Sequence, residues 1–443
     1  MNQTIYDEHR NALPGPDDIT RVKLPNGITV LARSNFNSPT LSIKGYLPSG
    51  SLFDPDEKLG LGYLTANGLM TGTAQYDFQS LYNEIESVGA RLGFSSGTLT
   101  TSFSAHCLSE DLNLMLDLIA GSLRSPVFPE KEFNRQKTQM LTGLAIRAQD
   151  TASMAALLFD KIVYAGHPYE RPEEGYVETV QSIEREDLIH FYERTFGPEG
   201  LTIAIVGAVD PDTTVAAVKA TLGDWTNEDQ ETLPELTFLK SIQKTTKKAL
   251  SIPGKSQADI VMGCQAPERL SPDYFPLRIG NNILGEFGMM GRLGQRVREE
   301  AGLAYYAYSS LNSSLGPGAW EMIAGINPRN INQTIALITE EIRRFVTEPV
   351  SEEELSDSKS NFLGRMPLLL ESNGGVAVSL LNIERFELGL DYFLQYPQLI
   401  QAVTADKILR TSQKYLDPDR LGDLFDGENT FYESLPDGGT DII

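Results

Sequence analysis

The order of helical and alternating segments repeats along this 443-residue chain, and this repeat constrains the fold more than any other feature. Residues 40–47 alternate as a strand does, and residues 58–71 read as an apolar helix. The same order returns at 258–264 and 273–285, at an offset of about 218–219 residues. A single hydrophobic core stops growing at about 250–300 residues, so the chain has material for two. The repeat therefore predicts an α+β fold of two similar domains from an internal duplication, each a mainly antiparallel sheet with helices packed on it.

Short-range patterns predict the elements of the first half. Residues 21–33 alternate around Asn26-Gly27, a dipeptide typical of tight hairpin turns, so we expect antiparallel strands there. Residues 201–206 form a continuous apolar run typical of a buried strand. The other elements expected in this half are a strand at 98–107 and helices at 77–88, 130–148, 151–164, 183–196 and 211–222.

Residues 226–244 indicate the boundary between the domains. This segment has no sustained hydrophobic period and carries a run of acidic and polar residues, which is typical of a linker. We therefore predict an N-terminal domain at 1–225 and a C-terminal domain at 245–443. The elements expected in the second domain are strands at 247–252, 258–264, 303–312 and 319–325, helices at 273–285 and 292–300, and long helices through 404–416.

Three glycine-containing motifs resemble known sites but lack the required surroundings. Residues 93–97 (GFSSG) have the G-x-S-x-G pattern of a serine nucleophile, yet they follow a helix rather than a strand, so we interpret them as a turn. Residues 254–256 (GKS) lack the first glycine of a phosphate-binding loop, and we interpret them as a hairpin turn. The glycines at every third position over 285–294 have no preceding strand, which favours a loop or a helix start over a dinucleotide site.

Side chains that bind metals tightly are sparse. The four histidines, none three or four residues from another, are His9, His106, His167 and His190. Paired imidazoles on one helix face need that spacing, so a self-contained histidine–zinc site is not expected, and His167 beside Pro168 is interpreted as a loop residue. Cys107 and Cys264 lie far apart in alternating apolar segments, which predicts buried thiols rather than a disulfide.

Charge and hydropathy exclude several classes of function. Sixty acidic residues against 37 basic ones give a net charge of −23, so a nucleic-acid backbone would be repelled over most of the surface. No stretch approaches the roughly 18 apolar residues of a membrane span, and the N-terminal residues do not resemble an export signal. We therefore expect a cytoplasmic protein that binds neither nucleic acid nor membrane.

Five segments together resemble the pitrilysin-type, or insulinase-type, zinc peptidases, and most closely their mitochondrial processing peptidase branch. They are residues 24–30 (LPNGITV), 60–73 (GLGYLTANGLMTGT), 166–171 (GHPYER), 292–305 (RLGQRVREEAGLAY) and 391–397 (DYFLQYP). The resemblance covers nearly the whole chain. It implies two similar α+β domains, which agrees with the internal repeat.

The resemblance also shows where this chain departs from the family. Family enzymes bind zinc through both histidines of an inverted H-x-x-E-H motif and a glutamate about 76 residues downstream, and the motif glutamate is the general base. The corresponding positions here are Tyr63, Ala66, Asn67 and, by spacing, Gly143. A phenol and a neutral amide are poor zinc ligands, and alanine and glycine offer none. We therefore expect no zinc and no catalysis in this chain alone.

The second half retains two residues that the family uses. In family pairs the C-terminal domain supplies an arginine and a tyrosine to the zinc site, and the matching residues are Arg298 and Tyr305. A guanidinium can bind a peptide carbonyl or a developing oxyanion, and a phenol can add a hydrogen bond. The alternative interpretation places Arg298 on a solvated charged helix and Tyr305 on a strand that packs against the core.

Two hypotheses for function follow from the resemblance. In the first, the chain is the non-catalytic subunit of a heterodimeric zinc peptidase, helps to form the peptide-binding chamber, and supplies Arg298 and Tyr305 to a homologous partner. That partner would carry the intact H-x-x-E-H motif and the zinc, making the pair a metalloendopeptidase. In the second, the chain is a structural or assembly protein of a larger complex, as the related core proteins of cytochrome complexes largely are.

Overall fold

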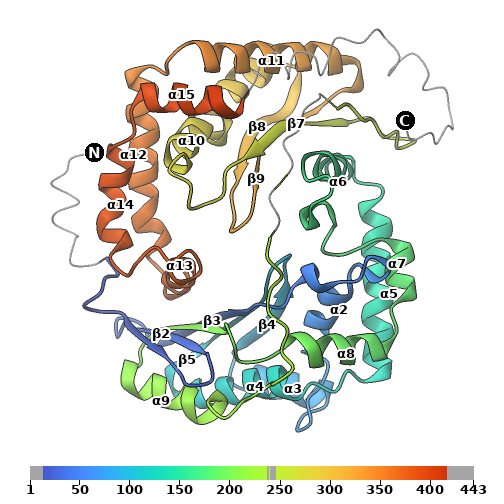
Figure 1. Ribbon diagram of the computed structural model, residues 1–443, viewed down its shortest axis with the longest axis vertical. Helices are drawn as coiled ribbons and strands as arrows, with labels where there is room; N and C mark the ends of the chain where they lie inside the picture. Colours follow the sequence, from blue (N-terminus) through green and yellow to red (C-terminus); the bar gives the residue numbers. More distant parts are fainter. Residues whose placement is uncertain (1–12, 237–238, 240–245, 417–443) are drawn as a thin grey trace. The chain divides into compact units, whose positions relative to one another are not determined.

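The computed structural model describes residues 13–236, 239 and 246–416, which form two compact units (Figure 1). The units are not continuous in sequence. Apart from the residues outside the description, the first unit contains the chain up to residue 145 with residues 171–235 and 365–396, and the second contains 146–170, 236–364 and 397–416. Each unit thus includes a segment from the other half of the sequence. The predicted boundary at 226–244 lies partly outside the described residues and stays a prediction.

The first unit is built on a six-stranded sheet in the order β1-β2-β6-β3-β5-β4. Its strands are β1 (Thr20–Lys23), β2 (Thr29–Ser34), β3 (Thr40–Leu47), β4 (Arg91–Ser96), β5 (Thr101–Leu108) and β6 (Thr202–Gly207). The predicted hairpin at 21–33 is confirmed as β1 and β2, and Gly27 takes the left-handed backbone conformation (φ 95°) that its turn requires. All pairs are antiparallel except β2–β6, so the sheet is mainly antiparallel.

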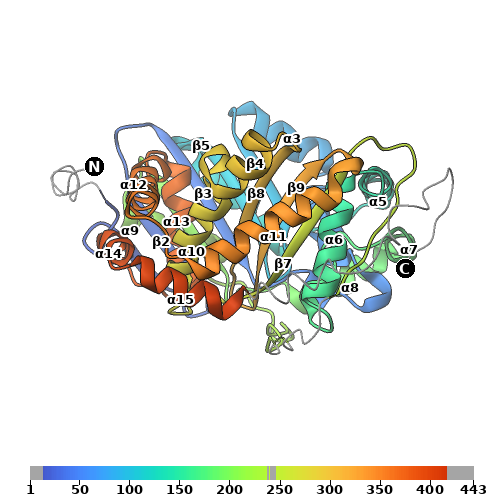
Figure 2. The ribbon, with the colours of Figure 1, turned by 90° about the horizontal axis from the view of Figure 1, so that it is seen from above.

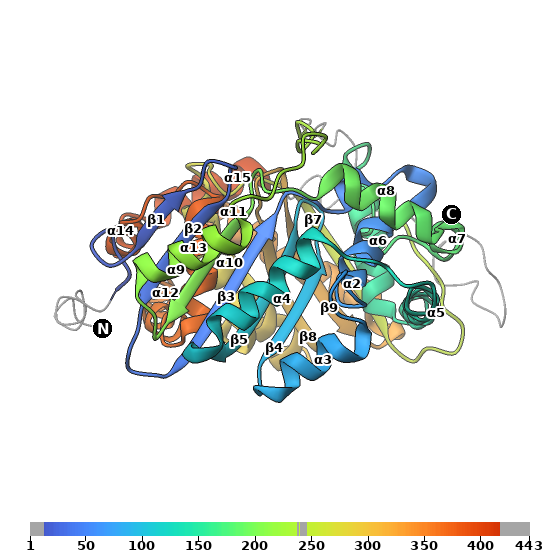
Figure 3. The ribbon, with the colours of Figure 1, turned by 90° about the horizontal axis from the view of Figure 1, so that it is seen from below.

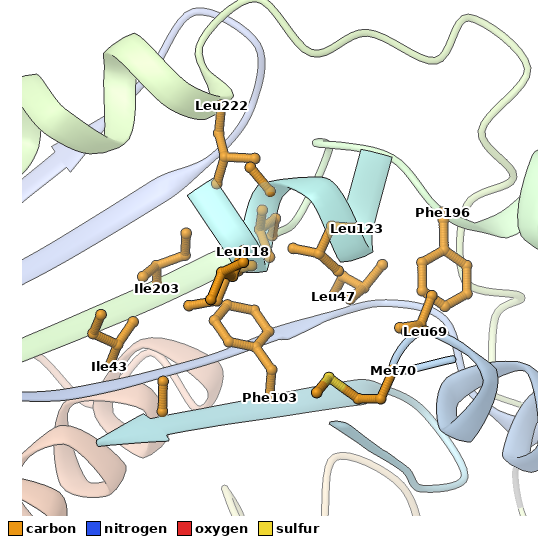
Figure 4. Packing of buried hydrophobic residues seen from close by; sticks show 14 of the residues in the cluster. Ile43, Leu47, Leu69, Met70, Phe103, Leu118, Leu123, Phe196, Ile203 and Leu222 are labelled. Atoms are coloured by element: carbon orange, nitrogen blue, oxygen red, sulfur yellow. The ribbon is translucent and has the colours of Figure 1, made fainter. Parts of the chain in front are cut away.

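Helices cover both faces of this sheet. On one face, α4 and α9 lie against the strands (Figure 3), and apolar side chains from β3, β5, β6 and these helices form the main core (Figure 4). On the other face, Leu31 and Val206 pack against Val376 and Leu380 of α13. The helices of this unit are α2 (Leu61–Gly68), α3 (Phe78–Ser87), α4 (Leu112–Arg124), α5 (Glu130–Arg147, largely in this unit), α7 (Val177–Ser182), α8 (Arg185–Thr195), α9 (Pro211–Leu222) and α13 (Asn373–Arg385).

The second unit is built on a three-stranded antiparallel sheet in the order β7-β9-β8. Its strands are β7 (Ala258–Ala266), β8 (Ala304–Asn312) and β9 (Gly318–Ile326). This order repeats β3-β5-β4 of the first unit, which confirms the predicted duplication. Its helices are α6 (Thr151–Val163), α10 (Tyr274–Asn281), α11 (Ile331–Thr347) and α15 (Ala405–Tyr415), while α12 (Glu352–Leu369) and α14 (Tyr392–Gln401) each run from one unit into the other.

The sheet of the second unit lies between helices from distant parts of the chain. Phe159 and Val163 of α6 pack against Ala319 and Val261 on one face. On the other face the buried ring of Trp320 lies 6.2 Å from the ring of Phe345 in α11. Figure 2 shows α10 and α11 beside α15, in agreement with their contacts.

Several predicted elements need correction. Residues 247–252 form no strand, so residues 254–256 make a turn but not a hairpin. Residues 93–96 belong to β4 rather than to a turn, because they pair with β5 along their whole length. The helix predicted at 273–285 continues from α10 into a short π-helix, η6 (Asn282–Glu286), and the helix predicted at 292–300 is a second π-helix, η8 (Gly294–Glu300). A π-turn adds one residue to an α-turn, which hydrophobic periodicity does not reveal.

Candidate functional site

The motif positions of the first unit lie on α2. Ala66 is fully buried, while Tyr63 and Asn67 are half-buried one turn apart. The Asn67 Nδ2 donates to the Tyr63 carbonyl oxygen at 2.9 Å, so this amide group is turned back onto its own helix. The Tyr63 ring packs against the main core of the unit. The side chains at two of the three motif positions on α2, Tyr63 and Asn67, thus make contacts within their own unit.

A buried carboxylate fixes the start of α2. The Asp54 oxygens accept hydrogen bonds from the backbone N–H groups of Gly60 and Gly62, each at 2.8 Å. Gly60 adopts a left-handed conformation (φ 99°) that side-chain-bearing residues rarely take. Burial raises the pKa of Asp54 to about 7, although both N–H groups and Arg171 favour its charged form. This carboxylate therefore positions the helix that bears the degenerate motif.

The fourth motif position is on α5, where Gly143 is exposed. No atom lies within 4 Å of the place where a side-chain Cβ would be. Seven residues earlier on the same side of the helix, the Gln136 Nε2 donates to the Asn67 carbonyl oxygen at 2.9 Å. The sequence analysis did not single out Gln136, although its spacing of seven from Gly143 places both residues on one helix face.

The residues at these positions do not fit a zinc ion. Tyr63, Ala66, Asn67 and Gly143 supply no imidazole and no carboxylate, which are the side chains that hold zinc in this kind of site. Within the described ranges, the structure contains no group of three or more His, Cys, Asp or Glu side chains arranged to hold a metal. That the isolated chain binds no zinc stays a prediction.

The second unit contains a hollow of about 640 Å³ beside β8. It is lined by Tyr274, Arg278, Glu286, Gly288, Met289, Gly294, Arg298, Tyr306, Ala307, Tyr308, Ser309, Ser310, Leu311 and Asn312. Two of these side chains are arginines, and they differ in their partners. Arg278 is tied to Glu286 by two hydrogen bonds, whereas the Arg298 Nε lies 3.7 Å from a Glu299 oxygen and its side chain is 43% exposed. Arg298 is therefore the more available cation of the hollow.

An internal ion-pair network anchors the segment that carries Arg298. The Arg292 Nε and Nη2 donate to the two Glu354 oxygens at 2.6 and 2.9 Å, and its Nη1 lies 3.5 Å from Glu341. The Arg292 side chain is only 10% exposed. Glu354 is itself buried in part, yet its pKa falls to about 2 because Arg292 and the backbone N–H of Ser351 hydrogen-bond its charged form. Arg292 was part of the recognised segment, but its role becomes visible only from these contacts.

Tyr305 lies at a bulge near the start of β8. The pairing of β8 with β9 passes from Ala304 to Tyr306, which leaves Tyr305 as the extra residue. The residue is 61% exposed and is not among those that line the hollow. Tyr305 thus lies on a strand with buried residues, as the alternative interpretation expected, but its own side chain points away from the core. Bulges often redirect a side chain next to a functional site.

The remaining residues singled out in the sequence have structural surroundings. Cys107 is buried in β5, where burial raises the pKa of its thiol to about 11, and Cys264 is half-buried in β7; both are free thiols. His167 lies in the loop after α6, as predicted, but is buried, with its Nδ1 accepting from the Tyr169 N–H. No helix in the described part of the chain is both long and apolar enough to cross a membrane.

Comparison with known proteins places the chain in a family. The sequence model of the insulinase family, peptidase family M16, matches residues 29–172, and that of the peptidase M16 inactive domain matches residues 182–362. An uncharacterized zinc protease of Mycobacterium leprae is 24% identical over 422 residues, covering 94% of each chain. A probable mitochondrial-processing peptidase subunit beta of Arabidopsis thaliana is 28% identical over 216 residues, covering 48% of this chain and 40% of its own length.

Solved structures agree with this assignment at the level of the fold. A peptidase M16 inactive domain from Pseudomonas fluorescens superposes with a TM-score of 0.85 at 23% identity, covering 91% of this chain and 96% of its own. A protease from Helicobacter pylori gives a TM-score of 0.83 at 19% identity, covering 92% and 98%. The chain therefore belongs to the insulinase-type family of zinc peptidases, peptidase family M16, whose two sequence models together match residues 29–172 and 182–362.

Proposed function

We propose that this chain is the non-catalytic subunit of a heterodimeric zinc peptidase. Its partner would be a homologous subunit with an intact H-x-x-E-H motif and the zinc ion. The observation that carries the proposal is a contrast between the two units. The motif positions of the first unit offer no imidazole or carboxylate, whereas Arg298 of the second unit lines a hollow with its side chain 43% exposed, and its only ion-pair contact among the described residues is a long one of 3.7 Å to Glu299.

The chemistry of the exposed side chains suits the binding of a peptide. A guanidinium carries a fixed charge and a fork of N–H donors, so Arg298 can bind a peptide carbonyl and the negative charge that develops on it during cleavage. A phenol hydroxyl such as that of Tyr305 can donate one further hydrogen bond. In the heterodimer these two side chains would complete the partner's active site, and the chain would form part of the peptide-binding chamber.

Arg296 offers a matched control for Arg298. Both arginines lie on η8, and their side chains are 42% and 43% exposed. Arg296 pairs with Glu300 and Glu340 and does not line the hollow. A change at either position removes the same charge from the same helix, so only a specific role separates their effects.

The test begins with the partner. Full-length tagged chain is purified from its native source, and mass spectrometry identifies the bound protein. The complex is then remade with Arg298→Ala or Arg296→Ala, and peptide cleavage is measured. We expect both variants to assemble, with Arg298→Ala lowering kcat by about 10²–10³-fold, as removal of an oxyanion donor does, and Arg296→Ala near the wild-type rate.

Two outcomes would contradict the proposal. One is a complex in which no bound protein carries H-x-x-E-H, which would favour a structural or assembly role. The other is a complex in which Arg298→Ala cleaves peptides at the wild-type rate, which would make Arg298 a structural residue.

A further inference from the structure

Tyr306, the residue after the exposed Tyr305, spans the sheet of the second unit. Its hydroxyl group donates to Asp259 Oδ1, which lies on β7, two strands away from β8. Between them on β9 is Gly325, which pairs with both residues. Asp259, Gly325 and Tyr306 thus lie at one level across all three strands.

We call the hydrogen bond from Tyr306 to Asp259 the bridge, and it depends on the absence of a side chain at Gly325. A Cβ at this position would lie 2.4 and 2.5 Å from ring atoms of Tyr306, far closer than atoms can approach. The Tyr306 ring therefore rests directly on the backbone of β9 and reaches across it. Glycine inside a strand often marks such a close approach.

The far end of the bridge is also held. The second Asp259 oxygen accepts a hydrogen bond from Thr151 Oγ1 at 2.5 Å, at the start of α6, and Gln257 Nε2 lies 3.2 and 3.1 Å from the two oxygens. A carboxylate with several donors has little freedom to move. The acceptor that fixes Tyr306 is thus itself anchored to the strand and to a helix.

This bridge begins at the bulge that exposes Tyr305. In a bulge one residue is left out of the ladder, and the flanking pairs decide which residue that is. One flanking pair is Ala304 with Ile326, and the other is Tyr306 with Gly325. The bridge through Asp259 holds the second pair in register, so it keeps Tyr305 as the extra residue.

We propose that Tyr306, bonded to Asp259 over Gly325, is a positioning residue that fixes the exposed side chain of Tyr305 for peptide contact. The part that concerns peptide contact rests on the proposed function. The part that concerns the placement of Tyr305 does not, and it is measured on the chain alone.

The first arm of the test follows Tyr305 in the full-length chain. The protein is labelled with 3-fluorotyrosine, and the ¹⁹F line of Tyr305 is identified by its loss in Tyr305→Phe. Tyr306→Phe removes the bridging hydroxyl, and Gly325→Ala displaces the ring. We expect both to shift or broaden the Tyr305 line. Tyr415→Phe is the matched control, because it removes another tyrosine–aspartate hydrogen bond, 2.9 Å to Asp273, in the same unit.

The second arm uses the peptidase complex and a double-mutant cycle. Loss of one neutral hydrogen bond corresponds to a change of about two- to tenfold, so Tyr305→Phe should raise KM by that factor with a smaller effect on kcat. Tyr306→Phe should also raise KM. Because Tyr306 acts through Tyr305, the double variant should raise KM no more than the larger single change does. Independent effects on KM would instead multiply.

The outcomes separate the two proposals. A Tyr305 line that stays unchanged in both Tyr306→Phe and Gly325→Ala overturns the positioning role, as do multiplicative effects in the cycle. If the line shifts but Tyr305→Phe leaves cleavage at the wild-type rate, the placement by Tyr306 stands and the role of Tyr305 in the proposed function fails.

Discussion

Glu321 on β9 offers a sharp test of how burial affects the stability of the second unit. Its Oε1 accepts a hydrogen bond from Asn312 at 2.8 Å, and neither it nor the nearby Asp160 of α6 has an ion-pair partner among the described residues. Burial, with a smaller contribution from the charge of Asp160, raises the pKa of Glu321 to about 7. Burial likewise raises the pKa of Asp160 to about 6.

These directions determine how stability changes with pH. Because the native state holds the Glu321 proton more tightly than the unfolded chain, this contribution to stability is complete below pH 4.5 and is lost as the pH rises through about 7. The difference from the ordinary 4.5 corresponds to about 3 kcal/mol, and partial exposure reduces it to about 2 kcal/mol. Glu321→Gln removes the charge but keeps a carbonyl acceptor for Asn312. It should therefore raise the free energy of unfolding by about 2 kcal/mol at pH 8 and change it little at pH 4.5.

The assay can report on the second unit alone. The chain has two tryptophans, of which Trp320 is buried in this unit with its indole N–H bonded to Asn281. Urea unfolding is followed by Trp320 fluorescence in a Trp225→Phe background at pH 4.5 and pH 8. Glu340→Gln, at an exposed position on α11, is the control and should change stability by less than about 0.5 kcal/mol at both pH values. Equal effects of Glu321→Gln at the two pH values, or destabilisation at pH 8, would refute the reasoning.

Two further predictions concern metal content and domain organisation. Metal analysis of the purified chain should find no stoichiometric zinc, and a peptidase assay should find no cleavage. The reason is that the zinc ligands and the base are replaced by Tyr63, Ala66, Asn67 and Gly143. One tightly held zinc per chain together with chelator-sensitive cleavage would contradict this prediction. Limited proteolysis should cut first within 226–244, whose described residues, 226–236 and 239, form no helix or strand, and give two fragments of similar mass on a denaturing gel. Early cleavage within 100–200 would count against that boundary.

The sequence predicts elements well where local chemistry and tertiary packing agree. Asn26-Gly27 needs only its own backbone preferences to make a turn, and residues 40–47 alternate because they form β3, a central strand. The strand β4 was missed because its small polar residues favour turns. Its strand state depends on pairing with β5, where the rings of Phe94 and Phe103 lie 5.8 Å apart.

Part of the candidate site could not be predicted from the sequence, because it depends on contacts between distant segments. Arg298 and Tyr305 could be named from the resemblance, and the structure places both at the protein surface. The bridge from Tyr306 to Asp259 joins residues 47 positions apart, and only the sheet register brings them together. Periodicity indicates which face of an element is buried, but not which distant segment covers it.

The exchange of segments between the two halves has a consequence for biosynthesis. Leu31 and Val206 are synthesised early, yet the α13 side chains that bury them are added only when the ribosome reaches Val376 and Leu380. Until then, a nascent first half presents an apolar sheet face to solvent or to a chaperone. Likewise, Phe159 of α6 cannot be buried until β7 and its neighbouring strand have been synthesised. The first half therefore cannot complete its folding on the ribosome until α13 has been made. A truncation that removes α13 should leave this face of the first sheet exposed and cause aggregation.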